Sequence, residues 1–378
     1  MKDRLVELDI LRGLSIVGMI LVITPGDWSQ RFQWMNHAEW EGYPLSDMIF
    51  PSFLFCVGMA MAISFNKGIN QNKSIYLLLG KVIKRTFLLI LIGLIINGFP
   101  FYDLKNIRIP GVLQRIAICY FIVACLWIFM KWRKTKKVEL WFVISALLIL
   151  IFYYILLYHI PVPSVGIAGH NSYSSWPTYI DQNVFGINHL WDLGTTNGEI
   201  TYDPEGIIAS LPATVNVISG VVAGLFYIRV KTVYTTALFF IAGLCLLIIG
   251  FSLDYFEIMP IIKKIWTSSF ALYSSGFSLL VLACIRFIIT YIPKTRHVFY
   301  PFIVYGSNAI LAFAIGNMLL PIFELYINNQ SIRKTGQDFF NSFIENEQWA
   351  SFTFSVVFLI LLFGLLKMLH TKKIFLKV

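Results

Sequence analysis

Residues 138–159 read VELWFVISALLILIFYYILLYH, and this stretch decides the fold class. After Glu139 it continues to its end without another acidic residue, lysine or arginine. A helix needs about 20 consecutive apolar residues to cross the hydrocarbon core of a bilayer. The stretch therefore predicts a membrane-spanning α-helix.

The rest of the chain repeats this pattern. Its 378 residues are 57% hydrophobic and 13% charged, whereas a soluble domain carries about 25% charged residues. We predict an all-α, polytopic integral membrane bundle of about ten transmembrane helices, forming a single domain over residues 1–378. The apolar segments are about 9–25, 45–65, 76–99, 110–131, 138–159, 206–229, 234–253, 268–291, 299–320 and 350–370.

Basic residues gather at alternate ends of these segments, for example at 81–85, 131–137 and 294–296. By the positive-inside rule, this distribution places both termini in the cytoplasm. It also accounts for the net charge of +10 without a nucleic-acid partner. The longest outer connection, about 160–205, is aromatic and contains no lysine or arginine. It fits either a carbohydrate-binding surface or an ordinary folded loop.

The five cysteines all fall in apolar segments, where small buried side chains are expected. His159, His170 and His189 do not form a spaced metal motif, and no CxxC pair is present. We therefore expect no metal site.

Residues 34–51, between the first two apolar segments, carry a histidine among carboxylates. His37 lies near Glu39, Glu41 and Asp47, and a histidine titrates near neutral pH. The stretch is compatible with a general base oriented by a carboxylate at the outer membrane surface. The alternative is a solvated surface histidine.

Charged groups inside membrane segments are costly, so each one is a candidate for function. Asp9 and Arg12 are three apart on one helical face, and they form either a structural ion pair or a site for a phosphorylated ligand. Arg115 lies about one turn inside its segment. It should pair with an acid such as Asp47 or line a polar cavity. Farther along, Asp203 before Pro204 is expected to cap the start of a helix.

Together these residues resemble the transmembrane acyltransferases related to heparan-α-glucosaminide N-acetyltransferase. The resemblance covers most of the chain through several short blocks in a shared order. They are Asp9-x-x-Arg12-Gly13, Pro25-Gly26, His37-Ala38-x-Trp40-x-Gly42, Asp47-x-x-Phe50-Pro51-x-Phe53-x-Phe55, Ile109–Arg115, Tyr202–Gly206, Trp266–Ser269 and Gly306-x-Asn308.

The resemblance implies that cytoplasmic acetyl-CoA, a co-substrate, gives its acetyl group to the amine of a glucosamine-type sugar or glycan on the outer side. His37 is then catalytic, as a general base or as the acetyl carrier, with Asp47 orienting its ring. For the acetyl-CoA site we predict Arg12, Gln114, Arg115, Ser268, Ser269 and Asn308. For the acceptor site we predict Asn36, Glu39, Trp40, Asp203 and Glu205.

The chain departs from the family at one position. Relatives often carry Asn before Pro-Gly, whereas this chain has Thr24. Thr24, Asn36 or Asn308 would then supply the donor to the thioester oxyanion. The extra N-terminal segment of the animal lysosomal enzymes is absent from the sequence, so we expect a bacterial inner-membrane protein, with a homodimer possible by family resemblance.

Two other functions fit a polytopic protein of this kind. A sugar or small-solute permease would use His37 and Asp47 to gate an outer vestibule. A binding or scaffold subunit would have no affinity for CoA.

Overall fold

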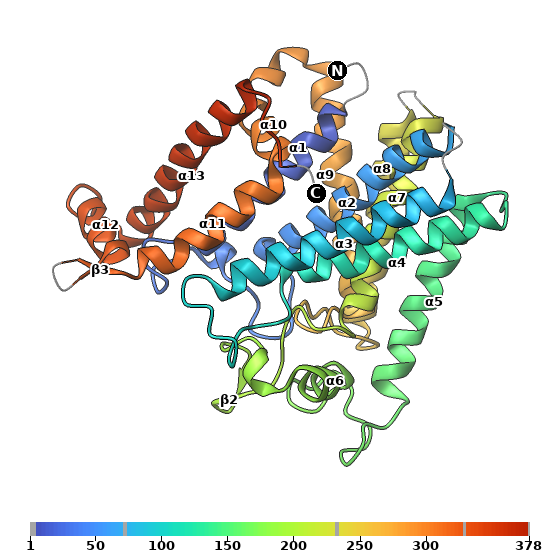
Figure 1. Cartoon of the computed structure of the whole chain (residues 1–378), viewed down its shortest axis with the longest axis horizontal. Helices are drawn as coiled ribbons and strands as arrows, with labels where there is room; N and C mark the ends of the chain where they lie inside the picture. The colour runs from blue at the N-terminus through green and yellow to red at the C-terminus, as the bar shows by residue number, and fades with distance from the viewer. Residues whose placement is uncertain (1–4, 71–73, 231–233, 328–329, 377–378) are drawn as a thin grey trace. The chain divides into compact units, whose positions relative to one another are not determined.

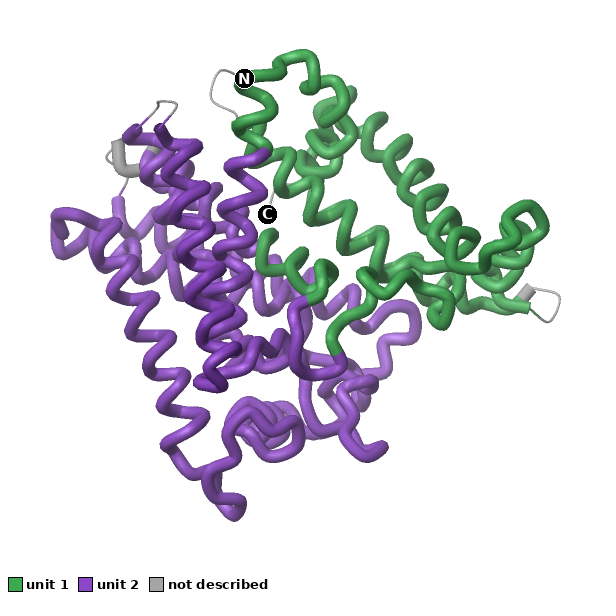
Figure 2. Tube along the Cα trace, turned by 180° about the vertical axis from the view of Figure 1, so that it is seen from behind, with its two compact units in different colours: residues 1–38, 44–53, 285–377 green, residues 39–43, 54–284, 378 purple. Residues whose placement is uncertain are grey.

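The computed structural model describes residues 5–70, 74–230, 234–327 and 330–376. It is mostly helical, and two-stranded antiparallel hairpins are its only described sheets. The chain forms two compact units, coloured separately in Figure 2: residues 1–38, 44–53 and 285–377, called unit 1, and residues 39–43, 54–284 and 378, called unit 2. The prediction of a single integral domain is not tested by this division.

Unit 1 is built around α1, which packs against α10, α11 and α13 (Figure 1). Gly13 and Gly306 allow the α1–α10 approach, since a Cβ at either would lie within about 2 Å of a carbonyl oxygen on the other helix. The elements of unit 1 are α1 (Val6–Ile23), η1 (Gln33–Met35), η3 (Pro293–His297), α10 (Tyr300–Ser307), α11 (Ala309–Phe323), β3 (Tyr326–Ile327), β4 (Gln330–Ser331), α12 (Ile332–Asn341) and α13 (Glu347–Thr371).

Unit 2 packs α4 against α3 and α7, and α7 against α5 and α8. Beyond the C-terminal end of α5 lie α6 and the β1–β2 hairpin (Figure 1). Its elements are α3 (Ile75–Gly98), α4 (Val112–Trp132), α5 (Val138–Tyr158), α6 (Trp176–Phe185), η2 (Ile187–His189), β1 (Thr195–Thr196), β2 (Glu199–Ile200), α7 (Ser210–Arg229) and α8 (Tyr234–Tyr255). Two helices, α2 (Leu45–Asn70) and α9 (Ser268–Tyr291), have residues in both units.

Seven described helices are long and apolar enough to cross a membrane, and an eighth span is formed if α10 and α11 count as one. All ten predicted segments are helical, which confirms the all-α, multi-pass class. The count is lower than ten because α1 and α3 each carry three charged residues. The spans differ widely in how deeply they are buried. In α2, 78% of the most apolar stretch is buried, whereas in α8 the share is only 17%, as expected of a lipid-facing helix.

Two local expectations were wrong. The helix after Asp203 begins only at Ser210, and Asp203 instead accepts a hydrogen bond from the backbone nitrogen of Glu205 and closes a turn. Cys245 on α8 and Cys284 on α9 are exposed and not buried.

Candidate active site

His37 and Asp47 form a hydrogen-bonded pair in unit 1. The distance between His37 Nδ1 and Asp47 Oδ1 is 2.6 Å. The Asp47 side chain is only 1% exposed, whereas that of His37 is 43% exposed. An ionised carboxylate accepts the Nδ1 proton, which makes Nε2 the basic nitrogen of the neutral ring. The pair can therefore present a base at an accessible surface.

The chain around this pair fixes the orientation of the carboxylate. Asp47 lies in the first turn of α2, where a negative charge is favourable, and its Oδ2 accepts the backbone N–H of Ala38 at 3.1 Å. The neighbouring Ser46 hydroxyl donates to the Asn36 carbonyl at 2.6 Å. The Asn36 side-chain oxygen is buried without a hydrogen-bond partner among the described residues. Both sides of His37 are thus tied to the start of α2.

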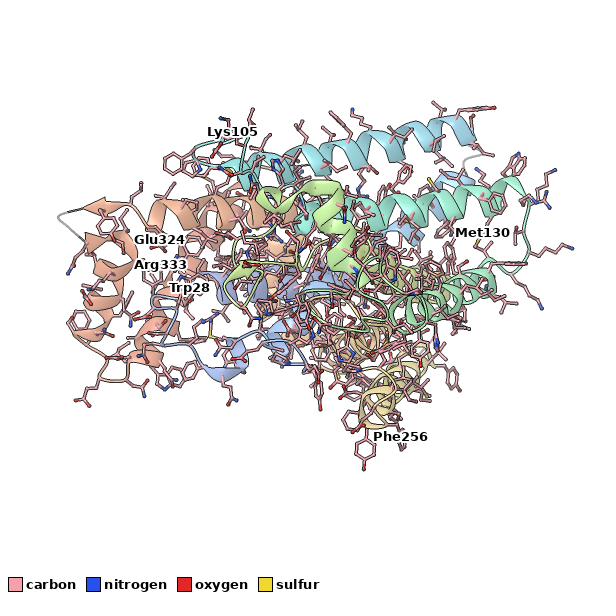
Figure 3. All side chains as sticks on the ribbon, turned by 90° about the horizontal axis from the view of Figure 1, so that it is seen from below. Trp28, Lys105, Met130, Phe256, Glu324 and Arg333 are labelled. Carbon is pink, nitrogen blue, oxygen red and sulfur yellow. The ribbon has the colours of Figure 1, made fainter. Side chains whose placement is uncertain are left out.

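Arg333 was not singled out from the sequence, but it holds the turn after α1. Its side chain donates to Glu324 at 2.6 Å and to the Pro25 carbonyl. Its guanidinium carbon also lies 5.3 Å from the centroid of the Trp28 ring. Figure 3 shows Trp28, Glu324 and Arg333 close together. A Cβ at Gly26 would lie 2.1 Å from the side-chain oxygen of Gln337, so this glycine packs closely against α12. A long-range cation therefore anchors the Pro-Gly motif.

The other candidates in unit 1 make structural contacts. Arg12 lies 3.6 Å from Asp9 and donates to the Gly306 carbonyl at 3.4 Å. The Asn308 amide donates to the Ile374 carbonyl at 2.8 Å and accepts from a C-terminal backbone N–H. The Thr24 hydroxyl donates to the Ile20 carbonyl at 2.8 Å. Their roles toward acetyl-CoA or an oxyanion stay predictions.

In unit 2, Arg108 brings Asp203 and Glu205 together. Its guanidinium contacts the two oxygens of Asp203 at 2.6 and 2.8 Å and also donates to Glu205. Burial alone would lower the pKa of Arg108, but the two carboxylates keep that pKa above its usual value. Burial acts to raise the pKa of Glu205, but the charges of Arg108 and Arg115 outweigh it and lower that pKa. The two predicted acceptor residues thus share one cation, Arg108.

A third carboxylate, Asp181 on α6, adjoins this group and escaped notice in the sequence. Its Oδ1 accepts the backbone N–H of Ile207 at 2.9 Å, and its side chain is buried. Burial raises the pKa of Asp181 to about 7, with a further upward contribution from the charge of Asp203. Asp181 therefore titrates in the physiological range.

Arg115 lies fully buried beneath Trp266. The guanidinium carbon is 4.7 Å from the indole ring centroid, and the group donates to Ser210 and to the Gly206 carbonyl. Trp266 has a left-handed backbone conformation (φ 52°), and its indole N–H donates to Asn216. For a bulky residue such a conformation is unusual and often accompanies a functional site.

Two neighbouring side chains of α4 retain unused hydrogen-bonding atoms. Arg115 Nη1 and both amide atoms of Gln114 are buried without a partner among the described residues. Native proteins rarely leave such atoms unsatisfied, so they fit a polar ligand. The predicted pairing of Arg115 with Asp47 joins residues of different units and stays a prediction.

The remaining predicted residues of unit 2 have mixed surroundings. The Ser268 hydroxyl donates to the Leu150 carbonyl, and the Ser269 hydroxyl to the Pro260 carbonyl. Trp40 packs edge-on against Tyr202, with ring centroids 5.1 Å apart. Glu39 is exposed, and its carbonyl accepts from Lys264. Among the described residues, no group of three or more His, Cys, Asp or Glu side chains could hold a metal ion.

Fold and site together define a multi-pass helical membrane protein with an accessible histidine held by a buried carboxylate. Residues 4–208 match the family model described as "Heparan-alpha-glucosaminide N-acetyltransferase, catalytic", and the chain belongs to this family. It is 29% identical to heparan-alpha-glucosaminide N-acetyltransferase of Homo sapiens over 378 aligned positions, covering 89% of this chain and 56% of the relative. The Mus musculus protein of the same name is 28% identical, with 84% and 54% covered. The chain thus spans about half the length of these relatives.

Proposed function

We propose that this protein is a transmembrane N-acetyltransferase. It moves the acetyl group of cytoplasmic acetyl-CoA to the amine of a terminal glucosamine-type sugar on the outer side of a bacterial inner membrane. The observation that carries the proposal is the His37–Asp47 pair, 2.6 Å apart, inside the region that matches the catalytic family model. The names of the relatives supply the reaction class and the acceptor.

The chemistry asks for a base beside the acceptor. A sugar amine is largely protonated at neutral pH and must lose a proton before it can attack a thioester. His37 Nε2 accepts that proton while Asp47 stabilises the resulting imidazolium through Nδ1. The new C–N bond forms as the C–S bond breaks. The protonated His37 then returns its proton to the CoA sulfur, which leaves as the thiol, and the acylated nitrogen releases its second proton to water.

A second route uses the same pair. His37 Nε2 attacks the thioester, carries the acetyl group and releases CoA before the amine attacks. The routes differ in one observable: only the second gives an acetylated protein without acceptor. Rapid quenching of the protein with acetyl-CoA alone, followed by peptide mass analysis, separates them.

The donor site is supported by the unsatisfied buried atoms of α4. Arg115 Nη1 and the Gln114 amide would bind polar groups of acetyl-CoA, with Arg12, Ser268, Ser269 and Asn308 as further candidates. A guanidinium suits a phosphate or a polarised carbonyl. For the acceptor, Asn36, Glu39, Trp40, Asp203 and Glu205 are proposed. Asp203 and Glu205 would support the acceptor site indirectly, because their contacts with Arg108 order the loop that carries them.

The test is release of CoA thiol by the purified full-length protein in lipid nanodiscs. Release from acetyl-CoA that depends on added glucosamine, with N-acetylglucosamine as product, supports the proposal. No release with any amino sugar, in a protein that is folded by thermal unfolding, overturns it.

A permease is the second candidate, and the break between α10 and α11 favours it. The two helices bend by 85° at Asn308, and broken helices form substrate sites in transporters. Proteoliposomes decide between the two functions. A permease accumulates labelled glucosamine without acetyl-CoA, whereas the acetyltransferase converts it only when acetyl-CoA is supplied.

A further inference from the structure

An open cavity of about 460 Å³, with a mixed polar and apolar lining, lies in unit 2. This volume falls within the range of small-molecule sites. Its walls come from the chain just after His37, the C-terminal end of α5 and the start of the long connection to α6. The lining residues used below are Trp40, Glu41, Tyr158, His170, Asn171 and Ser172.

His170 lies at the centre of a carboxylate–imidazole–phenol chain. Tyr158 Oη is 2.9 Å from His170 Nδ1, and Glu41 Oε1 is 3.4 Å from His170 Nε2. A phenol donates and a carboxylate accepts, so this arrangement fits the neutral ring with its proton on Nε2. The two contacts orient Glu41 while its side chain stays 56% exposed.

The short segment carrying Trp40 and Glu41 is fastened to unit 2. The Trp40 indole N–H donates to the His170 carbonyl at 3.1 Å. Two residues later, the backbone N–H of Gly42 donates to the Ile261 carbonyl at 2.9 Å. Trp40 and Tyr158 also pack on a buried cluster that includes Tyr153. The cavity wall is therefore a built part of unit 2.

The chemistry of the walls selects the ligand. Among the described lining residues there is no lysine or arginine, and Glu41 is negative, so a phosphorylated donor is disfavoured. A carboxylate favours an ammonium group, and aromatic rings favour the C–H faces of a sugar. Asn171 and Ser172 supply partners for hydroxyls.

We propose that this cavity is the acceptor subsite and binds the protonated amino-sugar ring, with Glu41 contacting its ammonium group and His170 positioning Glu41. The inference rests on the proposed function, because it names where that reaction's acceptor first binds. Trp40 belongs to the cavity and follows His37 by three residues in the chain. A sugar held here is thus held by the segment that continues directly from the proposed base.

The experiment measures binding separately from turnover. Radiolabelled glucosamine is equilibrated with the full-length protein in nanodiscs without acetyl-CoA, and unlabelled glucosamine, glucose or N-acetylglucosamine competes. The Glu41→Gln and His170→Phe variants are compared with Glu199→Gln. The Glu199→Gln control removes an exposed carboxylate from the long connection between α5 and α7, which also carries His170.

We expect Glu41→Gln to weaken glucosamine binding about fivefold, the scale of one partly exposed charge contact. It should raise the KM for glucosamine by a similar factor with little change in kcat. His170→Phe should give a smaller loss in the same direction. Glucose should compete equally weakly against all variants, because it lacks the ammonium group.

Two results would overturn the subsite: wild-type protein that binds no glucosamine, or a Glu41→Gln variant with unchanged glucosamine binding. Failure of the proposed function looks different. In that case glucosamine binding still depends on Glu41, but no CoA is released from acetyl-CoA. That outcome supports the subsite while rejecting the acetyltransferase.

Discussion

Replacing Arg108 with methionine tests the charged centre of unit 2. The guanidinium contacts both oxygens of Asp203 and also Glu205, whose side chains are 0% and 10% exposed. Methionine fills a similar volume but leaves the two carboxylates without this cation. Removing one partner of a buried ion pair costs about 3–5 kcal/mol, because the remaining charge stays desolvated.

The assay is thermal unfolding in detergent at a fixed heating rate, since membrane proteins commonly unfold irreversibly. At about 2 °C per kcal/mol for a large chain, the apparent Tm should fall by about 6–10 °C. The control is Arg133→Met, an exposed arginine after α4. Adding Asp203→Asn and Glu205→Gln to Arg108→Met should recover most of the loss.

The reasoning about this centre fails if Arg108→Met lowers the Tm no more than Arg133→Met does. It fails equally if neutralising both carboxylates gives no recovery, because the loss would then come from packing and not from unpaired charge.

Three further predictions concern single residues. Asp47→Asn should lower turnover about 100-fold, the equivalent of about 2–3 kcal/mol for a lost charged hydrogen bond to His37; thiol release measures it, and unchanged turnover contradicts it. The pKa of Asp181 is raised to about 7 in the folded protein, so its contribution to stability is complete below about pH 4 and is lost as the pH rises through 7. Asp181→Asn should therefore flatten the fall in Tm that the wild type shows between pH 5 and 8. Equal slopes for the two proteins would contradict this prediction. Arg333→Met should destabilise the protein by about 1–3 kcal/mol in thermal unfolding, because the buried Pro25 carbonyl loses its donor, against little change for exposed Lys334→Met.

The length of the apolar segments predicted the fold class well. A run such as 138–159 indicates a membrane-spanning helix by itself, without information about contacts that are distant in the sequence. The number of membrane-spanning helices was harder to predict. The predicted segments α1 and α3 are helices, but each carries three charged residues and is therefore less apolar than the other spans. The break at Asn308 was missed because Gly306, Ser307 and Asn308 interrupt the apolar segment 299–320 over only three residues.

In the candidate site, contacts between residues near in sequence could be predicted, and contacts between distant residues could not. The proximity of His37 to Asp47 could be predicted, since ten residues and a helix start keep them near each other. The pairing of Arg108 with Asp203 could not, because 95 residues separate them in the chain. Asp181 and His170 carried no local signal, since burial and partners from other elements give them their properties.

The most direct test of the central claim compares three full-length proteins in nanodiscs: wild type, His37→Ala and His297→Ala. His297 is also an exposed histidine, on η3, and it has no assigned role. Wild type and His297→Ala should release CoA from acetyl-CoA when glucosamine is present, and His37→Ala should be at least about 100-fold slower. Normal turnover by a folded His37→Ala protein would contradict the account.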